Sequence, residues 1–365
     1  MNIGVPREIK DKEGRVALSP DNVRKLTSEG LSVLIESGAG LGAGFTDDDY
    51  KSAGALMGTV EEAWQRDIVL KVKEPLPSEY ARLGGQILFT FLHLSGVPRA
   101  LTEALLNQGT TAIAYETVED ARGRLPLLAP MSAVAGNMAA LVGAYYLAQP
   151  HGGKGVQLGS VLGERHGKVL IIGDGVVAYH AARSAHGLGA NVVVLGLDAE
   201  KGAQWQATFG EGFQFEMSNA GNIQSHLADT DLLVGAVLRR GAKADYVVSE
   251  SHIKMLATGS GVVDVSIDQG GCIATSRPTS HSDPVYHHHG VLHYCVTNMP
   301  GAYPKTSSVA LSDAVLPYAQ RLALRGLDAL KEDAGFAKGL HTHQGKLHAK
   351  SVALDLKLED RYIPL

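Results

Sequence analysis

The sequence predicts an α/β fold of two Rossmann-like, doubly wound parallel-sheet domains, the first discontinuous and the two joined by long helices. Three observations support this prediction. Short apolar strands alternate with helical segments along most of the chain, which is typical of parallel sheets with right-handed crossovers. A strand, a glycine turn, a helix and a second strand follow one another within residues 168–195. The length of 365 residues favours two domains over one.

The first domain is predicted from a series of short apolar runs separated by helical segments. We expect strands at 1–6, 32–36, 68–73, 86–93 and 111–115. We expect helices at 20–29, 47–53, 61–64 and 98–107. Ser19 followed by Pro20 is a common helix start, because proline is tolerated at the first helical position. No glycine fingerprint occurs before residue 125, which indicates a purpose other than nucleotide binding.

The rest of the chain begins with a long apolar helix at 131–148 and a glycine-rich link at 151–155. After the strand–helix–strand unit, we expect strands at 231–237, 261–267 and 291–297. A helix is expected from 307 to 324, with two more near 329 and at 349–357. This tail has too little strand to form its own domain and should fold back on the first. We therefore assign 1–130 plus 305–365 to a substrate and catalytic domain, and 131–304 to a dinucleotide-binding domain.

The composition excludes several classes of protein. Apolar residues make up 45% of the chain and charged residues 19%, as in a globular protein with a large core. A net charge of −5 without blocks of like charge disfavours nucleic acid or an anionic membrane as a partner. The longest apolar run, 133–148, is too short and mixed to span a bilayer. Charged residues at the start do not resemble a signal peptide, and two cysteines in apolar contexts indicate a reducing cytoplasm.

The glycine turn matches a dinucleotide-binding fingerprint, G-x-G-x-x-A, through Gly173, Gly175 and Ala178. Gly173 permits a tight turn, Gly175 lets the backbone approach a pyrophosphate, and Ala178 keeps the helix close to the strand. The N-terminus of the helix, at Val176 and Val177, would receive the phosphate charge. Gly173, Gly175, Val176 and Val177 are therefore predicted to bind the cofactor.

Polar side chains follow several of the predicted strands. Lys73 and His93 end strands of the first domain, and Asp268 and Asn298 follow strands of the second. Arg15 lies in the loop after the first strand. Because ligands of parallel α/β sheets bind beyond the carboxyl ends of the strands, we expect these residues to converge on a cleft between the two domains.

This set of side chains permits a specific chemistry. A guanidinium binds a carboxylate in bidentate fashion, and a lysine stabilises negative charge on a carbonyl oxygen. A histidine can move a proton near neutral pH, and an acid can orient that histidine, a water or an amine. Hydride transfer belongs to the nicotinamide. The residues thus predict an NAD(P)-linked oxidoreductase acting on a small carboxylate with a 2-oxo, 2-hydroxy or 2-amino group.

Each of these residues also has an ordinary structural interpretation. Arg15 alone could form a surface ion pair, and one of Lys71 and Lys73 could face water. His93 could be a satisfied polar residue at a strand end, and Asp268 could cap the turn that follows it.

The clustered histidines and the cysteines have ordinary interpretations too. We expect no metal site at 287–289, because consecutive residues of a strand or loop point apart, nor at His341 and His343. Cys295 lies in an apolar run and is expected to be a core residue rather than a nucleophile.

Along nearly its whole length, the sequence resembles bacterial alanine dehydrogenase. The matching stretches are 4–10, 15–20, 71–75, 86–94, 112–118, 127–132, 267–272, 275–279 and 294–300. The NAD-binding subunit of proton-translocating transhydrogenase, from the same superfamily, is a weaker match. It lacks the Tyr-Glu-Thr-Val run at 115–118 and the Ile-Asp-Gln-Gly-Gly run at 267–271.

The resemblance implies reversible, NAD-dependent oxidative deamination of L-alanine to pyruvate and ammonia by a homohexamer. By motif position, Arg15 and Lys73 would bind the substrate carboxylate and carbonyl. His93 would be the acid and base, and Asp268 would assist the chemistry of ammonia and water. Ser132 would contact the pyrophosphate. The residues implied around the nicotinamide half are Val237, Leu238, Ile267, Asn298 and Met299.

The chain departs from the family pattern around the cofactor. The family carries an acid at the end of the second strand of the glycine unit, where it binds the adenosine ribose. Gly196 occupies that position here, and the nearest acid is Asp198. Asp174 lies inside the fingerprint, where it would repel a pyrophosphate unless it points away.

Three further departures lie in the same domain. Ala133 and Asn137 stand where the family's linking helix carries a glutamate and an arginine. The family carries a proline in the loop after Leu238, and this chain has Arg239-Arg240 there instead.

Two hypotheses follow from these departures. The first is an active alanine dehydrogenase in which cofactor preference has relaxed toward NADP, with Lys201 or Arg240 attracting the 2′-phosphate. The second is a homologue that keeps the fold, binds nucleotide poorly, and acts on another small amino acid or serves as a non-catalytic sensor. The presence of Arg15, Lys73, His93 and Asp268 favours the first.

Overall fold

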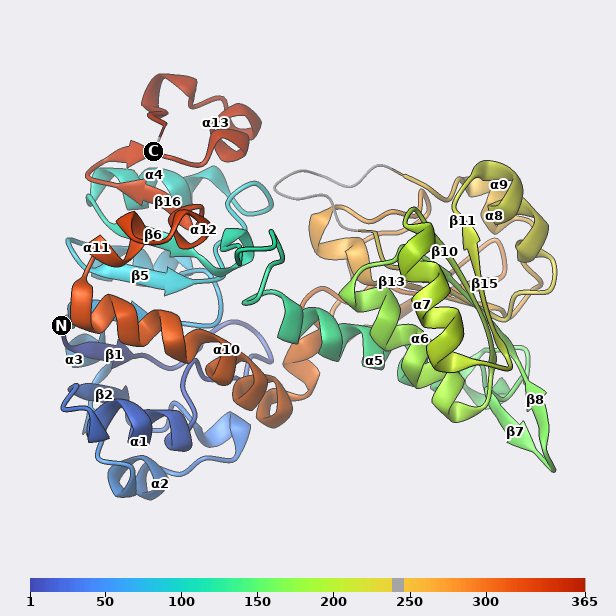
Figure 1. The fold of residues 1–365 in the computed structure, drawn as a ribbon, viewed down its shortest axis with the longest axis horizontal. Helices are drawn as coiled ribbons and strands as arrows, with labels where there is room; N and C mark the ends of the chain where they lie inside the picture. Colours follow the sequence, from blue (N-terminus) through green and yellow to red (C-terminus); the bar gives the residue numbers. More distant parts are fainter. Residues whose placement is uncertain (238–245, 365) are drawn as a thin grey trace. The chain divides into compact units, whose positions relative to one another are not determined.

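The computed structural model describes residues 1–237 and 246–364, which form two compact units (Figure 1). The first unit is Met1–Met131 with Gly301–Leu365, and the second is Ser132–Pro300. The chain leaves the first unit within helix α5 (Ala129–Tyr146) and returns to it within the short 3-10 helix η6 (Met299–Ala302). The catalytic and nucleotide-binding roles expected for these parts of the chain stay predictions.

A mixed sheet forms the centre of the first unit. In spatial order its described strands are β17 (Lys346–Leu347), β16 (Leu340–His343), β6 (Thr111–Ala114), β5 (Ile87–Thr90), β4 (Ile68–Leu70), β1 (Ile3–Val5), β2 (Val33–Glu36) and β3 (Leu56–Gly58). The strands from β6 to β3 run parallel, whereas β16 and β17 are antiparallel to their neighbours. The five strands predicted for this part of the chain are confirmed. Strands β3, β16 and β17 were not predicted.

Several helices of the first unit begin at residues whose side chains satisfy free N–H groups of the first turn. Ser19 caps α1, with Pro20 at its first position, and Thr46 and Thr59 form capping boxes for α2 and α3. The helices are α1 (Pro20–Ser28), α2 (Asp47–Ser52), α3 (Val60–Trp64), α4 (Arg99–Asn107), α10 (Pro304–Arg325), α11 (Asp328–Lys331), α12 (Ala334–Ala337) and α13 (Lys350–Leu356).

Both faces of this sheet are covered. Along β4, Ile68 and Leu70 belong to one apolar cluster with residues of α1 and α10, while Val69 belongs to a second cluster with residues of α4 and α13. Since successive strand residues point to opposite faces, burial of all three places helices on each side. The prediction of a doubly wound α/β architecture is confirmed for this unit.

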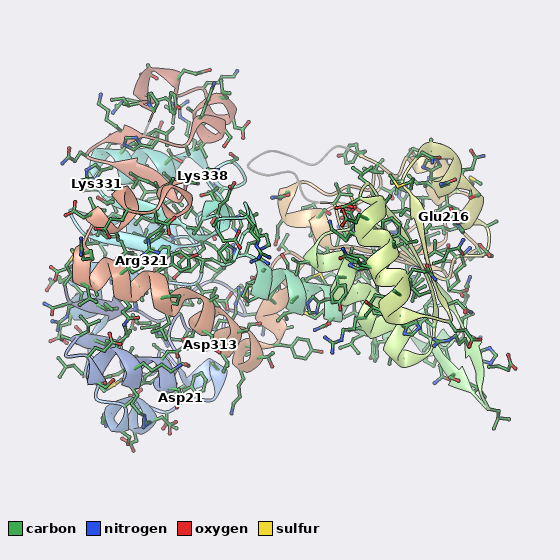
Figure 2. The ribbon with its side chains drawn as sticks, viewed as in Figure 1. Asp21, Glu216, Asp313, Arg321, Lys331 and Lys338 are labelled. Carbon is green, nitrogen blue, oxygen red and sulfur yellow. The ribbon has the colours of Figure 1, made fainter. Side chains whose placement is uncertain are left out.

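The C-terminal segment packs on the first sheet. Strand β16 pairs with β6, and the amide of Val16 donates to the Ser308 hydroxyl of α10 at 3.0 Å. Ion pairs add to this, since Arg321 binds Asp333 at 2.9 Å and Lys338 binds Glu119 at 2.7 Å (Arg321 and Lys338 are labelled in Figure 2). Of the long helices expected to join the two domains, α5 runs from one unit into the other, whereas α10 lies wholly within the first unit.

The second unit has its own, largely parallel sheet. Within its described part the strands are, in spatial order, β11 (Phe213–Met217), β10 (Asn191–Gly196), β9 (Lys168–Ile172), β12 (Leu232–Gly235), β13 (Gly261–Asp264), β15 (Val291–Tyr294) and β14 (Val285–His288). Only the pairing of β14 with β15 is antiparallel among these. The strands predicted to reach 237, 267 and 297 end at Gly235, Asp264 and Tyr294.

Helices flank this second sheet as well. They are α5, α6 (Val176–Leu188), α7 (Ala199–Phe209), α8 (Ala220–Leu227) and α9 (Glu250–Ile253), and a separate hairpin is formed by β7 (Gly159–Val161) and β8 (Glu164–His166). Small residues let α6 pack closely, because Ala178 is buried against the sheet and the α-carbon of Gly136 in α5 faces the backbone of Val177. No helix among the described residues is long and apolar enough to cross a membrane.

The order of the strands creates a switch point beside β9. From β9 the chain moves outward to β10 and β11, and then crosses back to β12 on the other side of β9. In open α/β sheets, ligands bind at the carboxyl ends of the strands at such a point. The loop after β9 contains Gly173, so the sheet places the glycine fingerprint where a ligand is expected.

Candidate functional site

In the first unit, charged side chains gather where four neighbouring strands end. Glu8 follows β1, Lys71 and Lys73 follow β4, His93 follows β5, and Glu116 follows β6. Since β6, β5, β4 and β1 are adjacent and parallel, their carboxyl ends meet at one edge of the sheet. A hydrogen bond of 3.0 Å from the Thr90 hydroxyl to the carbonyl of Lys73 joins the ends of β5 and β4.

Arg15 is a buried residue rather than a surface one. It is 2% exposed, and its Nε and Nη2 both donate to the Glu13 carboxylate, at 2.7 and 2.5 Å. Its Nη1 points to the sulfur of Met131 at 3.1 Å. The interpretation of Arg15 as a surface ion-pair residue is therefore wrong, because a paired guanidinium is held inside the unit by a bidentate contact.

Lys71 and Lys73 are both buried, so the expectation that one of them faces water is wrong. Lys71 lies between two carboxylates, 3.0 Å from Glu8 and 3.1 Å from Glu79. Burial alone would lower the pKa of Lys71, but Glu8 and Glu79 outweigh it and raise that pKa, so the ammonium stays charged. Glu8 also accepts the amide N–H of Val72 at 2.6 Å, which fixes the backbone next to Lys73.

Lys73 has a looser partner than Lys71. Its Nζ is 3.9 Å from Glu74, whose carboxylate also accepts from Lys10 at 2.5 Å. Burial would raise the pKa of Glu74, but the charges of Lys73 and Lys10 outweigh it and lower the pKa, so Glu74 is an anion. Lys73 is thus the lysine of the pair whose ammonium is not enclosed by two carboxylates.

His93 is held in an unusual backbone conformation by Glu116. The φ angle of His93 is 47°, in the left-handed region that few residues other than glycine adopt. Glu116 accepts the amide N–H of His93 at 2.7 Å and that of Leu92, and its carboxylate lies 3.9 Å from the ring Nδ1. The imidazole stacks on Phe91 and its side chain is 28% exposed, so a ligand can reach it. Such strain is concentrated at functional positions.

Three carboxylates of this edge were not singled out from the sequence. They are Glu8, Glu13 and Glu116, and each holds one of the predicted residues or the backbone beside it. Glu116 follows β6 directly, so the rule that selected Lys73 and His93 would have found it if applied to that strand. Glu8 and Glu13 lie in loops, where their pairing depends on how the chain turns.

In the second unit, the glycine loop has the geometry that a dinucleotide needs. Gly173 has a φ of 122°, and a Cβ added to it would collide with the carbonyl of Ala236 after β12. Gly175 is the N-cap of α6 with no side-chain cap, and a Cβ added there meets no heavy atom within 4 Å. Open space over the uncapped helix N-terminus, at Val176 and Val177, fits a pyrophosphate.

The other predicted nucleotide residues beside this loop have structural partners. Asp198 is the N-cap of α7, accepting the amide N–H of Lys201 at 3.0 Å. The ammonium of Lys201 donates to the carbonyl of Asp174 at 3.0 Å. The Asp174 carboxylate is turned to the end of β10, where it accepts N–H groups, which answers the concern that it would face the pyrophosphate. Ser132 is half-buried on α5.

The residues implied around the nicotinamide half come from three segments. Val237 follows β12 and its carbonyl accepts from the Ser266 hydroxyl at 2.7 Å. Ile267 and Asp268 lie in a 3-10 helix, η5 (Val265–Gln269), rather than at the end of a strand. Met299 is buried at the start of η6. Leu238, Arg239 and Arg240 lie outside the described residues.

Asp268 and Asn298 are brought together by the fold. The amide N–H of Asn298 donates to Asp268 at 3.2 Å, and Asn298 has a left-handed φ of 63°. Asp268 therefore does not serve to cap the turn that follows it. Another acid does, since buried Asp264 accepts the N–H groups of Ser266, Cys272 and Ile273 at 3.0–3.2 Å. Asp264 was missed because it lies inside an apolar run.

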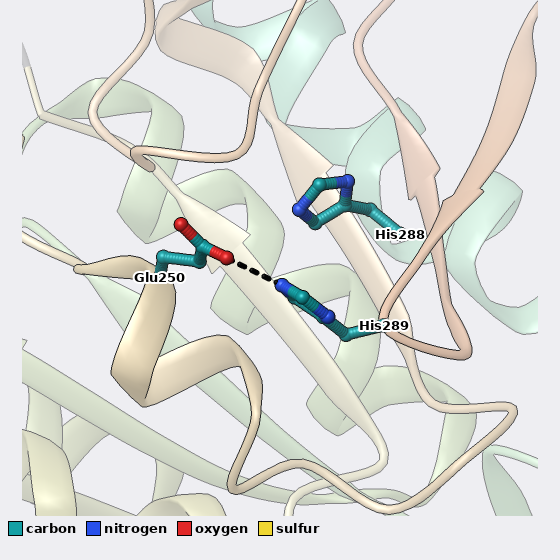
Figure 3. Close-up of side chains that lie close together, drawn as sticks. All are labelled: Glu250, His288 and His289. Atoms are coloured by element: carbon teal, nitrogen blue, oxygen red, sulfur yellow. Dashed lines mark hydrogen bonds and ion pairs between the residues drawn. The ribbon is translucent and has the colours of Figure 1, made fainter.

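One group of side chains has the composition of a metal site, although none was expected. Glu250, His288 and His289 offer ligand atoms within 4.8 Å of one another (Figure 3). The expectation that consecutive residues here point apart is wrong for His288 and His289. Their rings lie close together because His289 is in the turn after β14, with a φ of 52°. Glu250 is already bound, to His289 at 2.6 Å and to Lys254 at 3.2 Å, so the group is complete as an ion-pair cluster.

The remaining histidines and the cysteines are engaged in packing. His341 and His343 hydrogen-bond to Thr117 and Thr111 at 3.0 and 2.9 Å. Cys295 is fully buried, as expected of a core residue, and burial raises the pKa of its thiol. Burial also raises the pKa of Cys272, to about 12, so neither thiol is a nucleophile at neutral pH.

The chain is similar to proteins of one family throughout. The families described as alanine dehydrogenase/PNT, N-terminal domain and C-terminal domain, match residues 4–135 and 139–350. An alanine dehydrogenase of Mycobacterium tuberculosis (strain ATCC 25618 / H37Rv) is 49% identical over 98% of this chain and 97% of that protein. A solved L-alanine dehydrogenase has a TM-score of 0.93 at 47% identity, covering 98% and 99% of the two chains. A transhydrogenase from Sinorhizobium meliloti is more distant, with a TM-score of 0.80 at 25% identity over 95% of this chain and 100% of that one.

Proposed function

The chain belongs to the alanine dehydrogenase/PNT family, and we propose that it catalyses the reversible, NAD-linked oxidative deamination of L-alanine. In this reaction L-alanine, NAD⁺ and water give pyruvate, ammonium, NADH and a proton. The observation that carries the proposal is the charged edge of the first sheet, where Glu13 holds Arg15, Glu116 holds the backbone of His93, and the ammonium of Lys73 lies 3.9 Å from Glu74. Cations for a carboxylate and a histidine for proton transfer are what a 2-oxo acid requires.

Arg15 and Lys73 would bind the substrate. Glu13 fixes the guanidinium of Arg15 through two donors, which orients it without removing its charge. Glu74 is too far from Lys73, at 3.9 Å, for a direct hydrogen bond, so that ammonium can donate to the carbonyl oxygen of pyruvate. The positive charge of Lys73 then stabilises the negative charge that develops on this oxygen.

His93 would transfer the proton, and Asp268 would orient ammonia or water. Glu116 fixes the backbone of His93 and leaves its ring accessible. NAD, when bound, supplies the hydride acceptor for the deamination direction. Gly173, Gly175 and the first turn of α6 would hold its pyrophosphate, because the helix N-terminus there has no side-chain cap.

Initial rates with pyruvate and ammonium test the proposal, measured separately with NADH and with NADPH. We expect turnover with NADH, and its loss by a factor of about 10²–10⁴ in the His93→Ala variant, because the general acid and base is removed. The dissociation constant of NADH, measured by fluorescence, should be unchanged in that variant. Retained turnover would take His93 out of its role, and a wild-type protein that shows no saturable NADH binding would sink the proposal altogether.

The assembly and the compartment are further parts of the proposal. A homohexamer is proposed from the resemblance, and it is supported by apolar side chains such as Leu141 and Tyr145 that α5 exposes. A reducing compartment remains a prediction from the cysteines, both of which are free and buried.

A further inference from the structure

The end of β10 lacks the acid that dinucleotide-binding folds usually carry there. In such folds an Asp or Glu about 20 residues after the glycine loop binds the 2′-hydroxyl of the adenosine ribose, which favours NAD over NADP. The last residue of β10 here is Gly196, which has no side chain. From the sequence alone, this loss suggested a relaxed preference between the two cofactors.

The side chain of Asp174 fills the space beside Gly196. A Cβ built on Gly196 would lie 2.5 Å from Cζ of Phe215, 2.7 Å from the Cβ of Asp174 and 2.8 Å from its Oδ2. All three are closer than real Cβ contacts, so a side chain at 196 would require both the Phe215 ring and Asp174 to move. The loop after β9 therefore places a carboxylate where a side chain from the end of β10 would begin.

This carboxylate is anchored in place. Its Oδ2 accepts the amide N–H groups of Leu197 and Asp198, at 2.7 and 2.9 Å. Two such bonds to a single oxygen fix the orientation of the group. The Asp174 side chain remains 20% exposed, so the carboxylate can be reached by a ligand.

We propose that Asp174 supplies the ribose-binding carboxylate from within the glycine loop, in place of an acid at position 196, and thereby selects NAD over NADP. This inference rests on the proposed function, because it concerns the cofactor of the same reaction. The Oδ1 oxygen, which does not take the two backbone N–H groups, is the one that binds the ribose hydroxyl.

The charge around Lys201 points the same way. Lys201 was the described candidate for attracting a 2′-phosphate. Its Nζ instead lies 3.5 Å from Asp174 Oδ1 and 3.8 Å from Asp198 Oδ2, and donates to the carbonyl of Asp174. Two carboxylates around one ammonium leave a net negative charge, which repels the dianionic 2′-phosphate of NADP.

Asp198 is the alternative candidate for binding the ribose hydroxyl. It was the acid closest to position 196 in the sequence, but its Oδ1 accepts the amide N–H of Lys201 and so caps α7. Its side chain is half exposed, and it lies beyond the end of the strand. The cap ties Asp198 to the first turn of α7, whereas the bonds of Asp174 hold its carboxylate beside Gly196 at the end of β10.

Direct binding of paired ligands tests the proposal without any turnover. We would titrate NADH and NADPH, and then 5′-AMP and 2′,5′-ADP as competitors that differ only in the 2′-phosphate. The Asp174→Asn variant keeps the size and the acceptor oxygen but removes the charge. We expect the NADH over NADPH affinity ratio to fall at least about tenfold, equivalent to about 1.4 kcal/mol. Adding Lys201→Ala should remove the gain in NADPH affinity.

An exchange of positions provides the sharper experiment. Gly196→Asp alone should weaken NADH binding, because its Cβ collides with Asp174. The double variant Asp174→Gly with Gly196→Asp should restore the preference for NADH, because it removes the Cβ that a side chain at 196 would meet and moves the acid to the end of β10. Asp229→Asn, which alters an aspartate paired with Lys168 elsewhere in the unit, is the control.

Each outcome decides the question. An unchanged ratio in Asp174→Asn overturns the proposal, and so does a collapse of the ratio in Asp198→Asn instead. If the wild-type protein binds neither NADH nor 5′-AMP, it is the proposed function that fails. Circular dichroism and the thermal midpoint of each variant separate a loss of binding from a loss of fold.

Discussion

At the scale of residues, two positions of the same loop are glycine for different reasons. Gly173 has a φ of 122°, and a methyl group there would collide with the carbonyl of Ala236. Gly175 has a φ of −86°, which any residue adopts, and an open space next to its α-carbon. The first is required by the fold of the protein, whereas the second is explained only by a ligand.

Alanine substitutions at the two positions should therefore give opposite results. Gly173→Ala should destabilise the protein by about 3 kcal/mol, because it forces strain and a clash together, and its thermal midpoint should fall. Gly175→Ala should leave the midpoint unchanged and raise the NADH dissociation constant at least about tenfold, because the methyl group blocks the pyrophosphate. The idea is wrong if Gly175→Ala binds NADH as tightly as the wild-type protein.

The choice of residues could be predicted from the sequence better than their surroundings. Lys73 and His93 were found because they follow apolar strands, and the structure places both at the expected edge. That Lys71 is buried between Glu8 and Glu79 could not be predicted, since Glu8 lies 63 residues before Lys71 and Glu79 lies in the 3-10 helix after β4. Pairing of charges depends on the loops, which have no periodic pattern.

At the scale of elements, apolar runs predicted the existence of strands but overestimated their length. Val265 to Ile267 continue the apolar run of β13, yet they form a 3-10 helix, because Asp264 caps it and accepts N–H groups from the returning loop. In a sequence, apolar residues that are buried outside a sheet cannot be told from apolar residues that pair within one. This is why Asp268 was expected at a strand end and lies in η5.

Strand β16 was missed for the opposite reason. It is short and contains polar residues, among them His341 and Thr342, that are buried against β6. The composition of β16 does not predict that it is buried. Its partner strand could not be identified from the sequence either, because β6 lies more than 200 residues earlier in the chain. The neutral histidine that results has a measurable consequence.

Burial lowers the pKa of His341 from its ordinary value of about 6.5, more than the Glu116 charge raises it, and His93 lowers the pKa further. Below about pH 6.5, His341 therefore binds a proton in the unfolded chain but stays neutral in the folded chain until the pH reaches its lower folded pKa. Stability is full above pH 6.5 and falls as the pH drops from 6.5 toward the lower folded pKa, by about 1.4 kcal/mol per unit of depression.

Replacing His341 by glutamine should flatten this acid limb. The free energy of unfolding, measured between pH 7 and 5, should fall less steeply in His341→Gln than in the wild-type protein, even if the variant is less stable at pH 7. His166→Gln, which changes an exposed histidine of β8, controls for the substitution itself. Parallel curves for wild type and His341→Gln would contradict the prediction.

At the scale of the whole molecule, the two sheets could be predicted as doubly wound, because alternation and apolar runs report on both faces of a sheet. The return of the C-terminal segment to the first unit was expected from its lack of strand, but its two antiparallel strands at the sheet edge were not. Arg15 and Lys73, the residues proposed to bind the substrate, lie in one unit and the glycine loop lies in the other. Binding of the two ligands should therefore be separable by mutation.

Arg15→Lys provides that separation. Glu13 binds Arg15 through both Nε and Nη2, and a lysine cannot reproduce this fork. The KM for pyruvate should rise at least about tenfold, which corresponds to about 1.4 kcal/mol, while the dissociation constant of NADH stays within a factor of about two. Arg165→Lys is the matched control, because Arg165 donates to backbone carbonyls in the second unit, away from the glycine loop. If Arg15→Lys weakened NADH binding as much as it raised the KM for pyruvate, the two units could not have separate roles, and the assignment of Arg15 to the substrate would have to be given up.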